Sequence, residues 1–219
     1  MMKLFNRKKI NINSISIPDF GWTLVEDQKG IKQWVNPEQT IALSLNFFDF
    51  EPDLPTINQI DELRSFYRNQ IVSYNGGLIE VNNIQLKEYK AVKTIFKLPQ
   101  EPTGMTYIAS FTIPFEKYSY VVKIQAPEVG VTGMRDSVIA TKLMNENQIS
   151  IGENGYEGWF KDPYDLSFNQ GTMMNKSEEK QYDIEFPEHP LSQARKILDI
   201  IASEISFSAE LEKIKKFEK

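Results

Sequence analysis

Residues 105–126 read MTYIASFTIPFEKYSYVVKIQA, and this stretch decides the fold class. Large apolar residues alternate with smaller or polar ones on both sides of the short link 114–117. Period-two alternation is typical of β-strands that cover a core with one face. A link of this length joins neighbouring antiparallel strands. The stretch therefore predicts a hairpin with strands at 105–113 and 118–126.

The same pattern extends the sheet towards the N-terminus. Strands at 78–86 and 91–98 precede the hairpin and complete a four-strand meander. Two further β-rich runs, at 31–35 and 40–48, are separated by the turn composition Asn36-Pro-Glu-Gln39. The sequence thus predicts an antiparallel sheet of about six strands.

Three stretches predict helices. In residues 57–74 the apolar positions follow helical steps and form one stripe: Ile60, Leu63, Tyr67, Ile71 and Tyr74. Thr56 or Asn58 can cap its start, and Gly76-Gly77 supplies a left-handed stop. A second helix is expected at 134–144. The third begins near Pro190 with a stripe of Leu191, Ala194, Leu198, Ile201 and Ile205.

Strands and helices do not alternate along the chain, which favours an α+β fold over a parallel doubly wound sheet. We expect one α+β domain at 18–206, interrupted by an irregular, acidic and aromatic excursion at 148–188. A basic N-terminal tail at 1–17 and a polar helical tail at 207–219 are expected to flank it.

This order of elements, together with the opening Pro18-Asp-Phe-Gly-Trp22, resembles the PsbP-like fold group. The resemblance covers residues 18–145 and 190–206, and the excursion departs from it. It implies an α/β/α sandwich of an uncharacterised bacterial member. Most members of that group bind or assemble with other proteins rather than catalyse reactions, so the resemblance implies a non-enzymatic role.

Charge and composition narrow the classes of function. Residues 10–206 hold 27 acidic and 17 basic residues, a net charge of −10, which would repel a nucleic-acid backbone. The chain has no cysteine, so it forms neither disulfides nor thiolate metal sites. Arg7, Lys8 and Lys9 interrupt the apolar stretch that a signal peptide needs, and no window is apolar enough to span a membrane. We expect a cytoplasmic protein.

No catalytic, metal or cofactor motif emerges from the sequence. The single histidine, His189, precedes a helix, where local capping is a better interpretation than general-base catalysis. Asp162 and Asp165 lack the ligand pattern of a calcium loop and fit a turn. Residues 130–135 place two glycines and Arg135 before a helix, where an anion can bind, but a plain turn is favoured.

The excursion is the most informative segment for function. Between residues 150 and 188 there are nine acidic residues, three lysines and seven aromatic residues. Aromatic anchors among acids suit recognition of a basic protein surface. The candidate contacts are Tyr156, Trp159, Phe160, Asp162, Tyr164 and Asp165. The competing interpretation is that the rings fold back onto the sheet edge or the last helix, with the acids solvated.

Three functions follow from these features. The first is a protein-interaction module, such as a toxin antidote or a secretion or assembly accessory protein. The second is a small-ligand binding domain with an apolar cleft between sheet and helices, lined by Tyr107, Phe111, Tyr118 and Tyr120. The third is a hydrolase that uses carboxylates alone, which would need clustered, buried acids.

Overall fold

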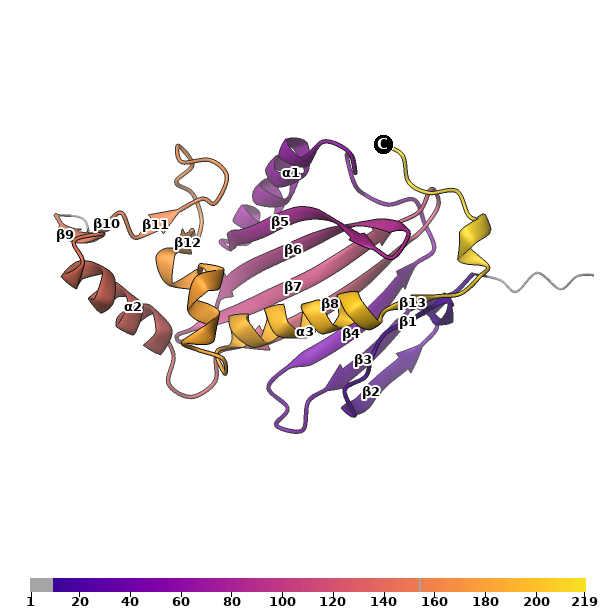
Figure 1. The fold of residues 1–219 in the computed structure, drawn as a ribbon, viewed down its shortest axis with the longest axis horizontal. Coiled ribbons are helices and arrows are strands. Elements are labelled where there is room, and N and C mark those ends of the chain that lie inside the picture. The colour runs from indigo at the N-terminus through magenta and orange to yellow at the C-terminus, as the bar shows by residue number, and fades with distance from the viewer. Residues whose placement is uncertain (1–9, 154) are drawn as a thin grey trace, which may run out of the picture.

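A seven-stranded antiparallel sheet forms the centre of the computed structural model, which describes residues 10–153 and 155–219 (Figure 1). The order of strands across the sheet is β2-β3-β4-β8-β7-β6-β5. Their bounds are β2 (Thr23–Gln28), β3 (Ile31–Val35), β4 (Ala42–Phe48), β5 (Gly77–Leu86), β6 (Tyr89–Pro99), β7 (Met105–Pro114) and β8 (Ser119–Pro127). The predicted α+β class with an antiparallel sheet is confirmed.

The hairpin from which the prediction started lies at the heart of this sheet. Phe111 of β7 pairs with Val122 of β8, in register along both strands. Alternate residues of each strand are at most 2% exposed: Tyr107, Ala109, Phe111, Ile113, Tyr120, Val122, Ile124 and Ala126. β4 pairs with the other side of β8, so segments distant in sequence meet at the centre of the sheet.

Two helices cover opposite faces of the sheet. α1 (Ile60–Ser73) packs on β5, and α3 (Pro190–Glu204) lies across β7 and β8 (Figure 1). Neighbouring residues of β6 point to different cores, because Ala91 packs in the cluster under α3 and Val92 in the cluster under α1. The α3 stripe is fully buried as predicted: Leu191, Ala194, Leu198, Ile201 and Ile205 are each 0% exposed.

Several details of these elements differ from the prediction. β2 was not predicted, because it is an edge strand with almost every residue exposed and therefore shows no alternation of apolar residues. α1 begins at Ile60 without a side-chain cap, since Thr56 Oγ1 binds the N–H groups of Asn58 and Gln59 ahead of it. Its left-handed stop is Asn75, with φ of 55°. Tyr74 is 75% exposed and is not part of the buried stripe.

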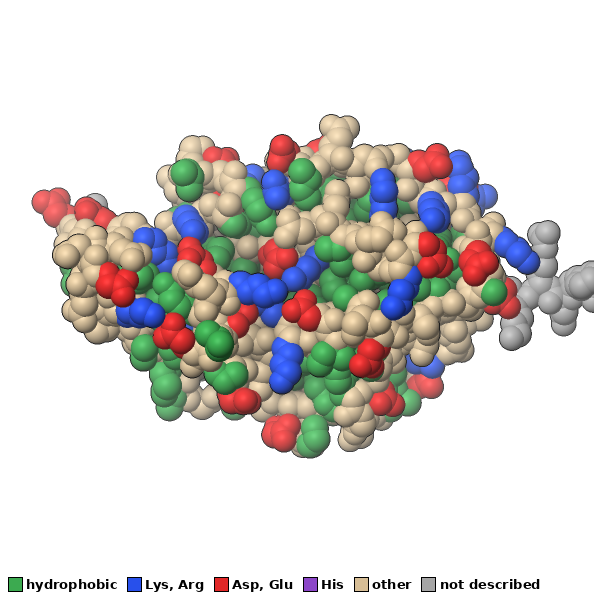
Figure 2. Space-filling model, in the orientation of Figure 1, with side chains coloured by type: hydrophobic (Ala, Val, Ile, Leu, Met, Phe, Trp, Pro, Cys, Tyr) green, Lys and Arg blue, Asp and Glu red, His purple; other side chains and the backbone are tan. Residues whose placement is uncertain are grey.

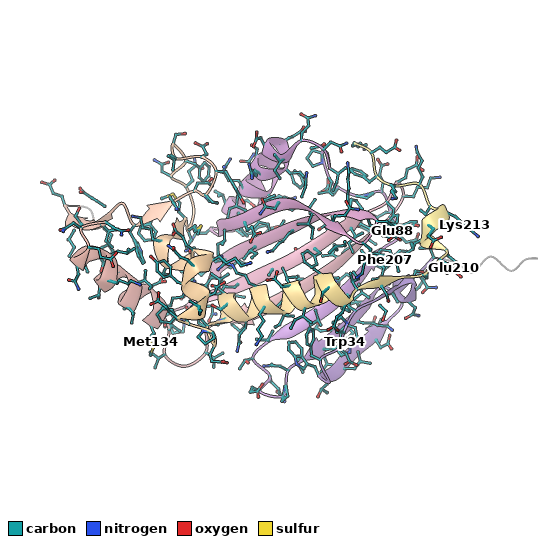
Figure 3. All side chains as sticks on the ribbon, viewed as in Figure 1. Trp34, Glu88, Met134, Phe207, Glu210 and Lys213 are labelled. Carbon is teal, nitrogen blue, oxygen red and sulfur yellow. The ribbon has the colours of Figure 1, made fainter. Side chains whose placement is uncertain are left out.

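The described parts of both expected tails, residues 10–17 and 207–219, are integrated into the fold. β1 (Ile15–Ser16) pairs with β13 (Ser206–Phe207), and Ile15 is buried. Only η4 (Leu211–Lys213) is helical after residue 207, and Figure 3 labels Phe207, Glu210 and Lys213 along this segment. Leu211 and Phe217 are 0% and 7% exposed, so the polar helical tail was a wrong prediction. Residues 1–9 of the expected basic tail lie outside the described residues.

The excursion and the helix before it form what we call the α2 lobe, the described residues within 134–188, at the left of Figure 1. It holds α2 (Met134–Asn145), the pair β9 (Ser150–Gly152) and β10 (Gly155–Glu157), and the pair β11 (Phe160–Lys161) and β12 (Met174–Asn175). Two short helices, η2 (Lys176–Glu178) and η3 (Lys180–Ile184), lead into α3. The lobe has its own apolar cluster of Ile139, Ala140, Leu143, Ile149, Trp159 and Tyr182.

Candidate functional site

The six residues predicted to contact a partner occupy different environments. Tyr156 and Phe160 are 44% and 51% exposed, and their rings flank Trp159. Trp159 itself is 4% exposed because it belongs to the apolar cluster of the α2 lobe. A partner therefore cannot reach Trp159 in this arrangement, and the prediction that it is a surface anchor needs correction.

Asp162 is also buried, at 4% exposure, and it acts as an internal anchor. Its carboxylate accepts two hydrogen bonds from Arg68 of α1, at 2.8 and 2.7 Å, in the bidentate geometry that guanidinium favours. Asp162 Oδ1 also accepts the backbone N–H groups of half-buried Tyr164 and Asp165. Asp162 thus ties the excursion to α1 and has no free surface for a partner.

Tyr164 packs beside α1 at the edge of the sheet. The guanidinium of Arg64 lies over the Tyr164 ring, 3.8 Å from its centroid. The hydroxyl of Tyr164 accepts the backbone N–H of Val81 in the edge strand β5. This is the fold-back that the competing interpretation predicted for the rings. That interpretation also placed the acids in solvent, and Asp162 and Glu178 contradict it because both are buried.

A buried polar network joins the lobe to the sheet and to α3. Lys97 of β6 pairs with Glu178 at 2.8 Å, and their side chains are only 2% and 1% exposed. Arg195 of α3 donates to the carbonyl of Glu178 at 2.7 Å and to the carboxylate of Asp183 at 2.9 Å. Sequence reasoning missed this network because its partners lie far apart in the chain.

Arg135 is the hub of the same network, with a fully buried side chain. It donates to the carbonyls of Ser177 and Glu179, to Ser192 Oγ and to Asp183 Oδ1, over 2.7–3.2 Å. The guanidinium is turned inward, and four of its five N–H donors bind protein oxygens, which agrees with the favoured interpretation of residues 130–135 as a turn and not as an anion site.

His189 lies beside Arg135, at the start of α3. Its Nδ1 accepts the backbone N–H of Leu191 at 3.3 Å, which confirms the predicted capping role. Its Nε2 faces Glu128 Oε1 at 3.5 Å, and its ring meets Tyr107 edge-on. With one nitrogen accepting from the backbone and the other facing a carboxylate, neither ring nitrogen is open to a substrate.

Glu128 is held by several donors at once. It accepts the backbone N–H groups of Met105 and Gly133, at 2.9 and 3.0 Å, as well as facing His189. Burial raises the pKa of Glu128, but the hydrogen bonds from His189, Gly133 and Met105 outweigh burial and leave this pKa below its ordinary value. The carboxylate is thereby kept charged and fixes the loop between β8 and α2.

A pocket of about 350 Å³ opens directly above these groups. Glu128, Arg135 and His189 lie at its base, and Glu185 and Glu188 stand at its exposed side. The rest of its lining is apolar: Val129, Val131, Met134, Phe186, Pro187 and Pro190. Two prolines and a helix start make this a rigid wall.

The pocket continues into an exposed apolar surface, which we call the valine–methionine patch. It consists of Val129, Val131, Met134 and Val138, which are 63%, 76%, 57% and 48% exposed. Hydrophobic side chains gather at the lower left of Figure 2, in the place where Figure 3 labels Met134. Single exposed apolar residues are ordinary, but a group beside a pocket is typical of a binding surface.

Sequence reasoning missed this patch, although a signal was present. Val129-Gly-Val131 places two valines in a strand-to-helix loop, where polar residues are usual, and Met134 and Val138 follow one helical turn apart. Without the orientation of α2, these residues could equally well be its buried stripe.

The residues proposed to line a sheet–helix cleft are buried in the core. Tyr107, Phe111, Tyr118 and Tyr120 are all at most 8% exposed and belong to the main apolar core. The Tyr118 and Tyr120 rings meet edge-on. The pocket described above lies at the end of β8 and is lined by other residues than these four.

Comparisons with known proteins give no family assignment. No family model matches the chain, and no curated protein sequence matches it. A structure from Bacteroides thetaiotaomicron VPI-5482 is 12% identical with a TM-score of 0.36, and the match covers 55% of this chain and 41% of that one. The putative regulator PA94 of unknown function from Pseudomonas aeruginosa is 9% identical with a TM-score of 0.34, over 59% of this chain and 87% of its own. This chain thus matches less than half the length of the Bacteroides protein.

Among the described residues, no helix combines the length and the apolar character that a membrane crossing requires.

Proposed function

We propose that this chain is a non-enzymatic, cytoplasmic protein-interaction module that binds a partner protein through the valine–methionine patch and the adjoining pocket. The observation that carries the proposal is this exposed apolar surface on a base fixed by buried hydrogen bonds of Glu128 and Arg135. A surface that keeps its shape before binding loses little conformational entropy when a partner docks. Toxin antidotes and assembly accessory proteins, the two kinds of module expected from the sequence, both work by such stoichiometric binding.

The proposed contact surface lies at the start of α2 and not at the six residues predicted from the sequence. Tyr156 and Phe160 remain available at the other end of the lobe, whereas Trp159 and Asp162 support it from inside. Most binding energy in protein interfaces comes from a few central apolar or aromatic side chains. Met134 and Val131 belong to the patch and also line the pocket, which makes them the candidates for that role.

Recovery of the tagged protein at native level, with Met134→Asp as the test variant, checks this proposal. We expect a single protein to co-purify in near-equal amount with the unaltered chain and to be lost with Met134→Asp. A charge at the centre of an apolar contact weakens binding by more than about tenfold. Aspartate in the first turn of a helix is favourable, so this variant is expected to fold.

The matched control is Val25→Asp, on the exposed edge strand β2 at 53% exposure, close to the 57% of Met134. It introduces the same charge at a distant surface, and the partner should be retained. A partner that stays with Met134→Asp, or the absence of any partner from the unaltered chain, would contradict the proposal.

A small ligand in the same pocket is the second candidate function. Its volume of about 350 Å³ lies at the small end of ligand-binding sites, which span roughly 300–1,000 Å³. Native mass spectrometry of the recovered protein distinguishes the two candidates. A small bound mass that disappears with Met134→Asp, without any protein partner, would favour the ligand.

A further inference from the structure

We infer, building on the proposed function, that the partner presents an apolar side chain flanked by lysine or arginine. The apolar side chain fills the pocket at the start of α3, and the basic residues meet the carboxylates at its side. The inference rests on three properties of the pocket: its satisfied base, its apolar wall and its acidic border.

The polar side chains at the base of the pocket already bind other protein groups, so they do not need a hydrogen bond from an occupant. The guanidinium of Arg135 already makes four hydrogen bonds to protein oxygens. His189 accepts from Leu191 and faces Glu128, which in turn accepts from Met105 and Gly133. An apolar group can therefore enter without leaving a buried polar atom unpaired, whereas a polar group would lose water without compensation.

The wall of the pocket matches an apolar group. Phe186, Pro187 and Pro190 form one side, and Val131 and Met134 of the patch form the other. Met134 has an unbranched, adaptable side chain, which packs well around occupants of different shape. Aliphatic and aromatic side chains of the partner both suit this lining.

The border of the pocket is acidic. Glu185 and Glu188 are both exposed at its side. Glu185 forms an ion pair with Lys142 at 3.1 Å. Glu188 accepts a hydrogen bond from the neutral amide of Gln193 at 2.9 Å, so its negative charge is not neutralised. The basic group at the base, Arg135, has 0% side-chain exposure and pairs with Asp183. The whole chain carries a net charge of −5, which favours the approach of basic segments.

The same charges disfavour other occupants. A second copy related by a two-fold axis would bring two acidic borders into one interface, and like charges across an interface cost free energy. An anionic membrane surface would be repelled for the same reason. A protein segment that combines apolar and basic residues satisfies both the wall and the border.

Selection from a library of random linear peptides displayed on phage tests the inference with the purified full chain. We expect enriched peptides to share one large apolar residue with lysine or arginine within a few positions. Binding of the best synthetic peptide should weaken by about three- to tenfold in the double variant Glu185→Gln/Glu188→Gln at low salt. The same loss should appear in the unaltered chain at high salt, because exposed charges are screened.

The variants Met134→Asp and Val25→Asp complete the design. Met134→Asp should abolish selection of these peptides, and Val25→Asp should leave it unchanged. Peptides without basic residues, peptides with acidic residues, binding that Met134→Asp leaves intact, or no enrichment at all would overturn the inferred partner chemistry. The co-purification experiment is independent, since a partner lost with Met134→Asp but lacking an apolar–basic segment would refute only this inference.

Discussion

Lys97 and Glu178 form an ion pair that water hardly reaches, since their side chains are 2% and 1% exposed. Both charges lose their hydration in such a position, and the attraction between the partners compensates for part of the loss. Glu178 Oε2 additionally accepts the backbone N–H of Asn175, so the carboxylate also fixes the start of η2. These two side chains connect strand β6 of the sheet to the α2 lobe.

Replacing Lys97 with methionine should lower the free energy of unfolding by about 3–5 kcal/mol, because it leaves the charge of Glu178 buried and unpaired. Urea denaturation of the purified variant measures this loss from the shift of the midpoint. The shape of the side chain is nearly preserved, so lost packing contributes little.

Lys93→Met is the matched control on the same face of β6. Lys93 pairs with Glu80 at 3.1 Å, but these side chains are 11% and 20% exposed, so water compensates for part of the missing charge. The loss should be clearly smaller than for Lys97→Met. Equal losses in the two variants would show that burial of Glu178 is not the cause.

At the scale of elements, the segment after α3 acts as a strap across one end of the sheet. The backbone of Glu116 donates to Lys215 and that of Ile57 donates to Lys219, so the strap touches both the β7–β8 turn and the approach to α1. Phe217, at 7% exposure, packs in the α1 cluster together with Leu54 and Ile57. The strap therefore contributes to the core beneath α1.

Phe217→Ala should destabilise the protein by about 3–5 kcal/mol, the usual loss for a buried phenylalanine. Thermal unfolding followed by circular dichroism provides the measurement. Phe50→Ala, at a residue that is 60% exposed, controls for the loss of an aromatic ring and should have little effect. A negligible effect of Phe217→Ala would restore the interpretation of 207–219 as a polar tail.

The sequence predicts elements best where one face is buried and the other is not. The strands at β7 and β8 and the helix α3 were located to within a few residues, because burial selects alternate or every third and fourth residue. β2 escaped notice because both of its faces are largely exposed. The strap escaped because its two buried residues, Leu211 and Phe217, stand among charged neighbours without a period.

The candidate site was less predictable than the fold for a physical reason. Arg68 and Asp162 lie 94 positions apart in the sequence, and Lys97 and Glu178 lie 81 positions apart. No local sequence pattern can therefore predict either pair. An acidic residue in a sequence looks the same whether it faces water or a buried base. For that reason Asp162 was interpreted as a contact residue although it supports the lobe from within.

At the scale of the whole molecule, the sheet with its two helices and the α2 lobe differ in what holds them together. The sheet and its two helices are held by large apolar clusters, whereas the α2 lobe has a small cluster of its own. Ion pairs of Lys97, Arg68 and Arg195 with acids of the lobe connect the lobe to the sheet, α1 and α3. Arg135 binds mainly within the lobe and reaches α3 only through Ser192. Such a lobe can open without the sheet, since regions with fewer buried apolar contacts unfold locally at lower free energy.

Arg135→Met should release the lobe selectively. Hydrogen exchange measured by mass spectrometry should accelerate in α2 and in residues 155–188, because four hydrogen bonds to Arg135 are lost. Exchange in β7 and β8 should stay slow, since their apolar contacts are unchanged. Uniform acceleration across the sheet and the lobe would instead show that the molecule unfolds as one unit.

The pairing of β1 with β13 has a consequence for synthesis on the ribosome. Ile15 must wait for Phe207 before their strands can pair. At the usual elongation rate of roughly 5–20 residues per second, the wait lasts about 10–40 s. During that time Ile12 and Ile15, which are later 4% and 3% exposed, have not found their final partners. The nascent chain therefore exposes apolar side chains through most of its translation. Until β13 emerges, only dilution or chaperones keep these side chains from aggregating with other chains.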